Sequence, residues 1–172
     1  GRPVARGDVL RVLPGPAPRS ASLAPELRPV ADAQLVLRAV PGPNRDYFTP
    51  AGRQALFSET FRVSQRADRR GVRLEGALVE MDCRRPSSIL SEPNTPGIVQ
   101  VTPDGAPMIL LREQTVGGYA KAATIIGPDL DRLAWALPGQ SLRFAPVSPA
   151  EAVAITRAEA LHQRRRRESL TG

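Results

Sequence analysis

The chain has 172 residues, of which 41% are hydrophobic and 24% are charged, so it is long enough for one domain with a buried core and too apolar for a disordered protein. Its 14 glycines and 18 prolines indicate many turns and argue against a helix bundle. The formal net charge is +7, but Lys121 is the single lysine among 24 basic residues, so we interpret the charge as an arginine bias and consider a nucleic-acid partner unlikely.

Short apolar runs separated by glycine and proline predict strands rather than long helices. A short strand can follow the Gly7-Asp8 turn over residues 9–13, and the proline-rich residues 14–33 predict a loop over the surface of the domain. Further strands are predicted over residues 34–40, 60–63, 72–79, 98–102, 108–111, 124–126 and 141–145. Pro103-Asp104-Gly105 predicts a tight hairpin between the fourth and fifth of these strands.

Two short helices are predicted among these strands. Thr49 before Pro50 is an N-cap signal for a helix through Phe57, and residues 129–136 place their apolar side chains on one face of a second helix. Seven or more short strands with two or three short helices favour a mainly β fold, a closed or half-closed β-barrel. We expect its core to include Val99, Val101, Ile109, Leu111, Ile125 and Leu142.

A terminal helix and a basic tail are expected to end the chain. Ser148-Pro149-Ala150-Glu151 is a capping box with proline at the first helical position. We expect this helix to end near Arg164–Arg167, with residues 164–172 as a solvated tail. The predicted division is a lobe over residues 1–152, which includes the 14–33 loop, and a helix end with the basic tail over residues 153–172. The side chains expected to pack the helix are Ile155, Ala158 and Leu161.

The scarcity of cysteine and histidine excludes several kinds of site. Cys83 is the single cysteine, which excludes a disulfide framework and a multi-cysteine metal site. With His162 as the single histidine, a histidine-ligated metal or a Ser-His-Asp triad is close to excluded. No apolar run reaches the ~18 residues of a membrane span, and no leader opens the chain, so we expect a soluble, cytoplasmic protein without a bound metal.

The first candidate functional segment is the predicted strand around Arg73. Arg73 and Glu75 alternate onto one face of this strand, and Gly71 and Gly76 would let a ligand or the backbone approach closely. An arginine at this place can hold a carboxylate or phosphate in bidentate geometry. The alternative is an exposed strand with arginine–glutamate pairs, which charge patterning alone does not exclude.

Two further candidates are an amide in a strand and a loop with two glycines. Gln100 is polar within an apolar run, and a buried amide needs a partner. In Gln114-Thr115-Val116-Gly117-Gly118-Tyr119, the backbone amides of Gly117 and Gly118 can bind an anion or a developing oxyanion. Each motif also has a purely local explanation, as a proline loop feeding a strand and as an ordinary turn.

A set of short motifs, in order over residues 1 to about 152, resembles one protein family. The motifs are Gly1-Arg2-Pro3 with Gly7-Asp8, Pro41-Gly42-Pro43 with Asp46-Tyr47-Phe48, Val63-Ser64, Asp68-Arg69, Gly71-Val72-Arg73-Leu74-Glu75-Gly76, Ser91-Glu92, Pro96-Gly97-Ile98-Val99-Gln100-Val101, Pro103-Asp104-Gly105-Ala106-Pro107 and Gln114-Thr115-Val116-Gly117-Gly118-Tyr119. The chain is similar to the C-terminal half of the biotin-dependent carboxyltransferase or allophanate hydrolase subunit 2 family, which includes the C subunit of 5-oxoprolinase. The resemblance implies a cyclophilin-like β-barrel lobe and a chain without the family's N-terminal lobe.

The resemblance also implies an amide-bond hydrolase that acts with partners. Similar proteins join a B subunit and a separate A subunit to convert 5-oxoproline to glutamate with ATP, so ATP is expected in the assembled hetero-oligomer. Phosphorylation of the lactam oxygen creates a leaving group, while a held carboxylate positions the ring. Arg73 would clamp an anionic group, and Gln100 and Glu75 would bind the substrate. The amides of Gly117 and Gly118 would bind negative charge, and Tyr119 would complete the pocket wall or donate a proton.

Other interpretations stay open at this point. Within the same family, carboxyl transfer from carboxybiotin to a urea-like nitrogen would make biotin the cofactor, carried by a separate domain. A non-catalytic regulatory or structural lobe, of the kinase-inhibitor antagonist type, would need the partners but would carry no chemistry. A nucleic-acid-binding module is retained only for the arginine run.

Deletion of residues 164–172 is expected to leave the melting temperature almost unchanged, because adjacent arginines repel one another and a solvated segment adds little to the core. Differential scanning fluorimetry of the full and shortened chains measures this. Loss of binding to a protein partner or to RNA at physiological salt on deletion would instead give this segment a function.

Overall fold

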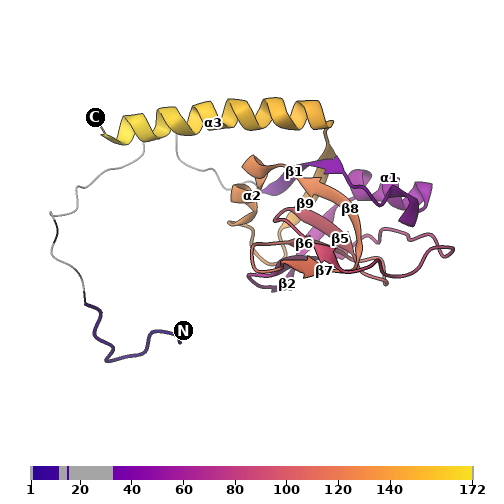
Figure 1. The fold of residues 1–172 in the computed structure, drawn as a ribbon, viewed down its shortest axis with the longest axis horizontal. Helices are drawn as coiled ribbons and strands as arrows, with labels where there is room; N and C mark the ends of the chain where they lie inside the picture. Colours follow the sequence, from indigo (N-terminus) through magenta and orange to yellow (C-terminus); the bar gives the residue numbers. More distant parts are fainter. Residues whose placement is uncertain (1, 12–14, 16–32, 172) are drawn as a thin grey trace.

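The computed structural model describes residues 2–11, 15 and 33–171, and its strands close into a barrel (Figure 1). Within these residues seven strands form the barrel, in the order β1-β8-β5-β6-β3-β2-β9, and β4 and β7 form a separate two-stranded sheet. The strands are β1 (Gln34–Pro41), β2 (Phe61–Ala67), β3 (Gly71–Gly76), β4 (Glu92–Pro93), β5 (Ile98–Val101), β6 (Pro107–Leu110), β7 (Val116–Gly117), β8 (Ala120–Ile125) and β9 (Ser141–Pro146). The predicted mainly β barrel is confirmed.

Three α-helices accompany the barrel in the described part of the chain, as the sequence predicts. They are α1 (Pro50–Ser58), α2 (Gly127–Leu133) and α3 (Pro149–Thr171), and a short 3₁₀ turn, η2 (Arg45–Tyr47), precedes α1. The Thr49 hydroxyl caps α1 by accepting a hydrogen bond from the amide of Gly52 at 3.0 Å. The capping box of α3 is also present, since the Ser148 amide donates to Glu151 at 2.7 Å. The predicted N-terminal signals of α1 and α3 are therefore confirmed.

Some predicted strands and loops differ from the structure. β3 ends at Gly76 rather than at residue 79, because Gly76 has a φ of +111° that turns the chain out of the barrel. Residues 8–11 form no strand, so the strand predicted from residue 9 is wrong over the residues described there. The predicted 14–33 loop lies outside the described residues, apart from residues 15 and 33.

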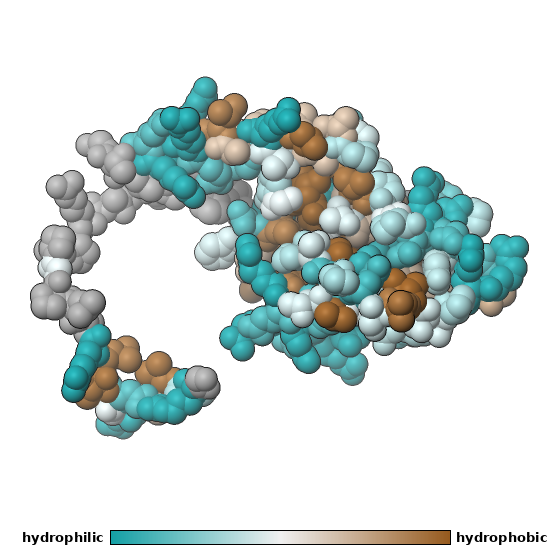
Figure 2. Space-filling model, in the orientation of Figure 1, coloured by the Kyte–Doolittle hydropathy of each residue, from teal (hydrophilic) through white to brown (hydrophobic). Residues whose placement is uncertain are grey.

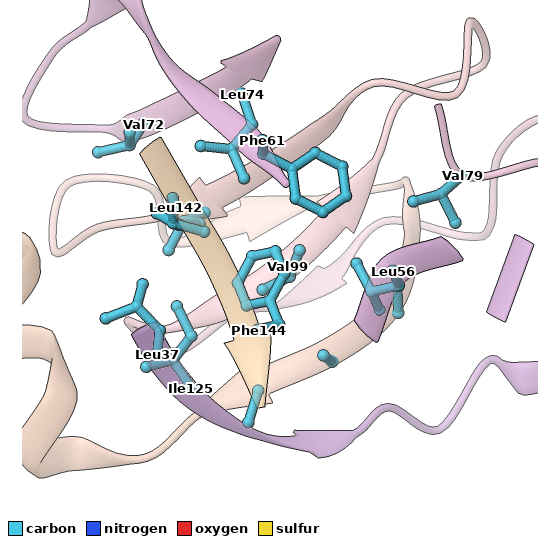
Figure 3. Packing of buried hydrophobic residues seen from close by; sticks show 14 of the residues in the cluster. Leu37, Leu56, Phe61, Val72, Leu74, Val79, Val99, Ile125, Leu142 and Phe144 are labelled. Atoms are coloured by element: carbon cyan, nitrogen blue, oxygen red, sulfur yellow. The ribbon is translucent and has the colours of Figure 1, made fainter. Parts of the chain in front are cut away.

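The barrel interior is filled by aliphatic side chains around two aromatic rings (Figure 3). The rings of Phe61 and Phe144 lie 5.7 Å apart at a tilt of 58°, within the range of favourable aromatic pairs. Of the predicted core, only Leu111 is half-buried, and it packs against the cluster. The predicted core residues that are buried in the structure are Val99, Val101, Ile109, Ile125 and Leu142.

An ion pair between the buried Asp129 and the partly exposed Arg38 attaches α2 to the barrel. Asp129 is 0% exposed and accepts hydrogen bonds from Nε of Arg38 at 3.0 Å, from its Nη2 at 2.6 Å and from its main-chain amide at 2.6 Å. The pKa of the Arg38 guanidinium is raised, mainly by this hydrogen bonding to Asp129 and to a smaller extent by the charge of Glu159 on α3. β1 is therefore linked electrostatically to both α2 and α3.

The helix α3 is longer than predicted and uses a different face. It continues through the arginine run to Thr171, so the predicted tail is helical, and polar side chains cover much of its C-terminal part at the upper left of Figure 2. Arginine favours helix, and Arg164 pairs with Glu168 one turn later at 3.1 Å. Leu161 is 63% exposed, so the expected packing through it is wrong. Among the α3 residues whose burial is described, the half-buried ones are Ala152, Ile155, Glu159 and Gln163, so Ile155 is half-buried as expected and Ala158 is exposed.

In the described part of the chain, no helix has both the length and the apolarity that crossing a bilayer requires.

Truncation of Ile109 to alanine is expected to lower the free energy of unfolding by roughly 2–5 kcal/mol, because this side chain is 0% exposed in the barrel interior. Chemical denaturation followed by circular dichroism measures the change. Leu90→Ala is the matched control, since Leu90 is 90% exposed and its loss should change stability by less than about 0.5 kcal/mol. A similarly small loss at Ile109 would show that β6 does not line the core.

Candidate functional site

Four side chains form a row across the outer face of the barrel, from β3 through β6 and β5 to β8. The register pairs Arg73 with Met108, Met108 with Gln100, and Gln100 with Lys121. Residues that face one another across antiparallel strands point to the same side of the sheet. The neighbouring row points into the core and consists of Val72, Ile109, Val99 and Ala123. The row from Arg73 to Lys121, named here the outer row, therefore points away from the core.

Arg73 lies at one end of the outer row with an exposed side chain. Two strand spacings separate it from Gln100, which places their backbones about 10 Å apart. The pKa of Asp104 is lowered, first by the hydrogen bond that the Thr102 hydroxyl donates to it and in addition by the charge of Arg73. Arg73 is thus a solvent-accessible cation on the same outer face as Gln100, next to the tip of the β5–β6 hairpin.

Gln100 is buried under the small β4–β7 sheet and is 1% exposed. Its amide nitrogen donates to Oδ1 of Asn94 at 3.4 Å. A Cβ at Gly117 would lie 3.1 Å from Nε2 of Gln100 and 2.9 Å from Nδ2 of Asn94, so glycine is what allows β7 to approach these amides. The structure thus brings Gln100 and Gly117 into contact.

Asn94 supplies an unusual hydrogen-bond donor at this place. Its Nδ2 is buried and has no hydrogen-bond partner among the described residues, while its main-chain amide donates to the Thr115 carbonyl at 2.8 Å. Buried donors are rarely left unpaired, because each costs about 1–3 kcal/mol. The position beside Gln100 therefore suits an acceptor oxygen, such as that of a carbonyl or carboxylate group.

Lys121, the single lysine of the chain, ends the outer row and was not among the predicted site residues. It is 8% exposed, and its Nζ contacts the carboxylate of Glu92 at 2.9 Å and donates to the carbonyl of Pro93 at 3.1 Å. Its main-chain amide donates to Oδ1 of Asn44 at 2.9 Å. The lysine thereby ties β4 to β8. A lone lysine in an arginine-rich chain, two residues after Tyr119, is the sequence signal that could have identified it.

The other predicted site residues lie around this cluster. The Gly118 carbonyl accepts a hydrogen bond from the Ile89 amide at 2.7 Å, and a Cβ at Gly118 would lie 2.9 Å from the Ile89 carbonyl oxygen, so close packing explains this second glycine. Tyr119 is half-buried in the bend immediately before β8. Glu75 accepts a hydrogen bond from the buried Ser64 hydroxyl, on the β2 side of Arg73 and away from Gln100.

The arrangement combines one exposed guanidinium, two side-chain amides and one buried ammonium group. These groups can bind carboxylate and amide oxygens. Among the described residues no group of three or more histidine, cysteine, aspartate or glutamate side chains is placed to hold a metal.

Gly117→Ala is expected to displace the side-chain amides of Gln100 and Asn94, because the new methyl group would lie within about 3.1 Å of both. The side-chain amide resonances of these two residues in a ¹H–¹⁵N NMR spectrum should shift, with a loss of roughly 1 kcal/mol or more in unfolding free energy. Gly127→Ala is the control, since nothing lies within 4 Å of a Cβ there. Unchanged Gln100 and Asn94 resonances would contradict this packing.

Two groups of known proteins are similar to this chain in sequence, the C subunits of 5-oxoprolinase and the urea amidolyases. The chain is 36% identical over 118 residues to the C subunit of 5-oxoprolinase from Escherichia coli (strain K12), covering 68% of this chain and 37% of that protein. It is 27% identical over 168 residues to urea amidolyase of Lachancea kluyveri, covering 86% of this chain and 9% of that protein. The chain thus spans just over a third of the length of the 5-oxoprolinase protein that it matches.

The fold is also shared with a solved structure of low sequence identity. The crystal structure of the K. lactis urea amidolyase superposes with a TM-score of 0.72 at 20% identity, covering 80% of this chain and 9% of that one. The family described as "carboxyltransferase domain, subdomain A and B" matches residues 1–146. This match ends just before α3 and includes the whole barrel, with the outer row and the β4–β7 sheet, so the chain belongs to the carboxyltransferase domain family.

Proposed function

We propose that the chain is a lobe of an ATP-dependent 5-oxoprolinase, equivalent to part of its C subunit, and that it converts 5-oxoproline to glutamate together with partners that resemble the A and B subunits. The sequence relationship to the C subunit of 5-oxoprolinase supports this proposal. Because the chain spans 37% of that relative, the activity is assigned to the assembly and not to the lobe alone.

The observation that carries the proposal is the outer row, which places a cation and buried amides on one face. 5-Oxoproline has a carboxylate and a lactam, and each has a complementary group here. The guanidinium of Arg73 can hold the carboxylate through two parallel hydrogen bonds. The side-chain amides of Gln100 and Asn94 can pair with the lactam N–H and C=O. An arginine side chain is long enough to span part of the roughly 10 Å between the Arg73 and Gln100 backbones.

Lys121 would act at the lactam end of the substrate. Lys121 is paired with Gln100 in the strand register, and its ammonium group could stabilise negative charge on the lactam oxygen. Access to Gln100 requires the β4–β7 sheet to move, since this sheet covers it. Its two strands pair through two residues each, and the contacts of Lys121 with Glu92 and Pro93 and of Asn94 with Gln100 and Thr115 would have to yield as it moves.

ATP is proposed to bind to another part of the assembly. Lys121 lies in the sequence Gly-Gly-Tyr-Ala-Lys-Ala, which differs from the glycine-rich P-loop pattern that holds nucleotide phosphates with a lysine. The residues of this lobe therefore do not fit a P-loop nucleotide site, and no phosphorylation step is assigned to them.

The burial of Gln100 favours a second candidate function. A side chain that is 1% exposed and already paired with Asn94 has its hydrogen bond without a ligand, which suits a non-catalytic regulatory or structural lobe.

The carboxyltransferase chemistry of the family is a variant of the first proposal. The ureido ring of biotin presents one carbonyl and two N–H groups, which the amides of Gln100 and Asn94 also match.

Arg73→Gln is expected to lower 5-oxoproline-dependent glutamate formation about 10- to 100-fold in an assembly reconstituted with the partner subunits, because one charge-assisted bidentate contact is lost. The melting temperature should change little, since Arg73 is exposed.

Arg66→Gln is the matched control, because Arg66 is an exposed arginine on the neighbouring strand β2. Equal activity of the Arg73 and Arg66 variants, with the assembly intact, would reject the substrate role of the outer row and support the non-catalytic lobe.

A further inference from the structure

An apolar cavity lies between α1 and the barrel, and its lining contains none of the outer-row residues. Its volume is about 240 Å³, which exceeds the ~150 Å³ of an apolar protein cavity that accepts benzene. Its walls are mainly apolar, and they include Phe48, Leu56, Phe57, Val79 and Ala122. The cavity is therefore large enough for a small aromatic or branched aliphatic group.

Contacts at both ends of α1 keep this cavity open. At the N-terminal end, the Thr49 hydroxyl donates to the Glu80 carboxylate at 2.6 Å, and Gly52 packs so closely that a Cβ there would lie 2.2 Å from the Glu80 carbonyl oxygen. At the C-terminal end, Nη2 of Arg143 donates to the Ser58 carbonyl at 3.0 Å. The helix is thus held against neighbouring segments at each end and cannot settle further to fill the space beneath it.

Arg45 supplies a positive charge where this cavity meets a more open groove. The two spaces share Pro41, Arg45 and Pro146 in their linings. The second cavity arginine, Arg53, is engaged, since its Nη1 donates to the carbonyls of Phe48 at 2.6 Å and Arg45 at 3.1 Å.

The guanidinium of Arg45, in contrast, is available to a ligand. Within the described residues of 33–171 it has no side-chain hydrogen bond or ion pair, and the neighbouring carboxylate of Asp46 is paired with Arg85 at 2.5 Å. A guanidinium without a protein partner at the mouth of an apolar cavity is suited to a carboxylate, which it binds through two parallel hydrogen bonds.

We propose that this cavity is a binding site for a small carboxylic acid with an aromatic or branched apolar body. The body occupies the space between α1 and the barrel, and the carboxylate contacts Arg45 at the mouth. Ligand sites commonly combine such a mainly apolar cavity with one or two placed polar groups. The residues of this site are not those of the outer row, so ligand binding here does not depend on the proposed function.

Phenylacetate is a suitable probe, with neutral phenylacetamide as its matched analogue. In the unaltered full chain with ¹³C-labelled methyl groups, NMR should show intermolecular NOEs from the phenyl ring of bound phenylacetate to the methyls of Leu56 and Val79. Titration should show that Arg45→Gln weakens phenylacetate binding about tenfold or more while phenylacetamide binding changes less than twofold. Arg66→Gln should leave the affinity for both probes unchanged.

Three results would overturn the proposal. One is the lack of saturable phenylacetate binding to the unaltered chain at millimolar concentration. Another is a set of NOEs to methyl groups elsewhere with none to Leu56 or Val79. The third is an equal loss of affinity in the Arg45 and Arg66 variants, which would indicate general attraction to a basic surface. Because the NOEs are measured on the unaltered chain, the test does not depend on the folding of a variant.

Discussion

The parallel pairing of β1 with β9 closes the barrel, and the remaining architecture depends on it. The pairing runs from Gln34 opposite Ser141 to Ala39 opposite Pro146, while the other edge of β1 pairs with β8. Closure removes the free edges that an open sheet would expose and gives every strand one inward and one outward side. The sorting of side chains into an apolar interior and an outer face that carries Arg73, Gln100 and Lys121 follows from this closure.

The small β4–β7 sheet shields part of the outer wall of the barrel from water. On an uncovered barrel, Gln100 and Lys121 would face water, but here they are nearly as buried as the apolar core. Their burial is compensated by groups from the covering segment, with Asn94 at Gln100 and Glu92 at Lys121. A polar layer of this kind is stable only while both sides are in place, so the covering sheet and the barrel wall form one electrostatic unit.

Local sequence signals were sufficient for most of the fold and for Arg73, Gln100 and Gly117 at the site, but not for the contacts that join distant segments there. The cap at Thr49 and the Pro103-Asp104-Gly105 hairpin depend on neighbours within a few residues, and the structure contains both. The contact of Lys121 with the Pro93 carbonyl joins residues 28 positions apart, and no local pattern specifies that pairing. The repulsion among adjacent arginines predicts a helix end near Arg164, but the helical propensity of arginine and the Arg164–Glu168 pair outweigh it, and α3 continues.

The burial of the single lysine has a practical consequence for the chemistry of this surface. Apart from the terminal amine, Lys121 is the only primary amine of the chain, and its Nζ is engaged by Glu92 and Pro93 beneath the covering sheet. Amine-directed reagents should therefore modify the native lobe very slowly at this side chain, and modification there would mean that the sheet has opened. The reactivity of Lys121 toward such reagents therefore measures how often the covering sheet separates from the barrel.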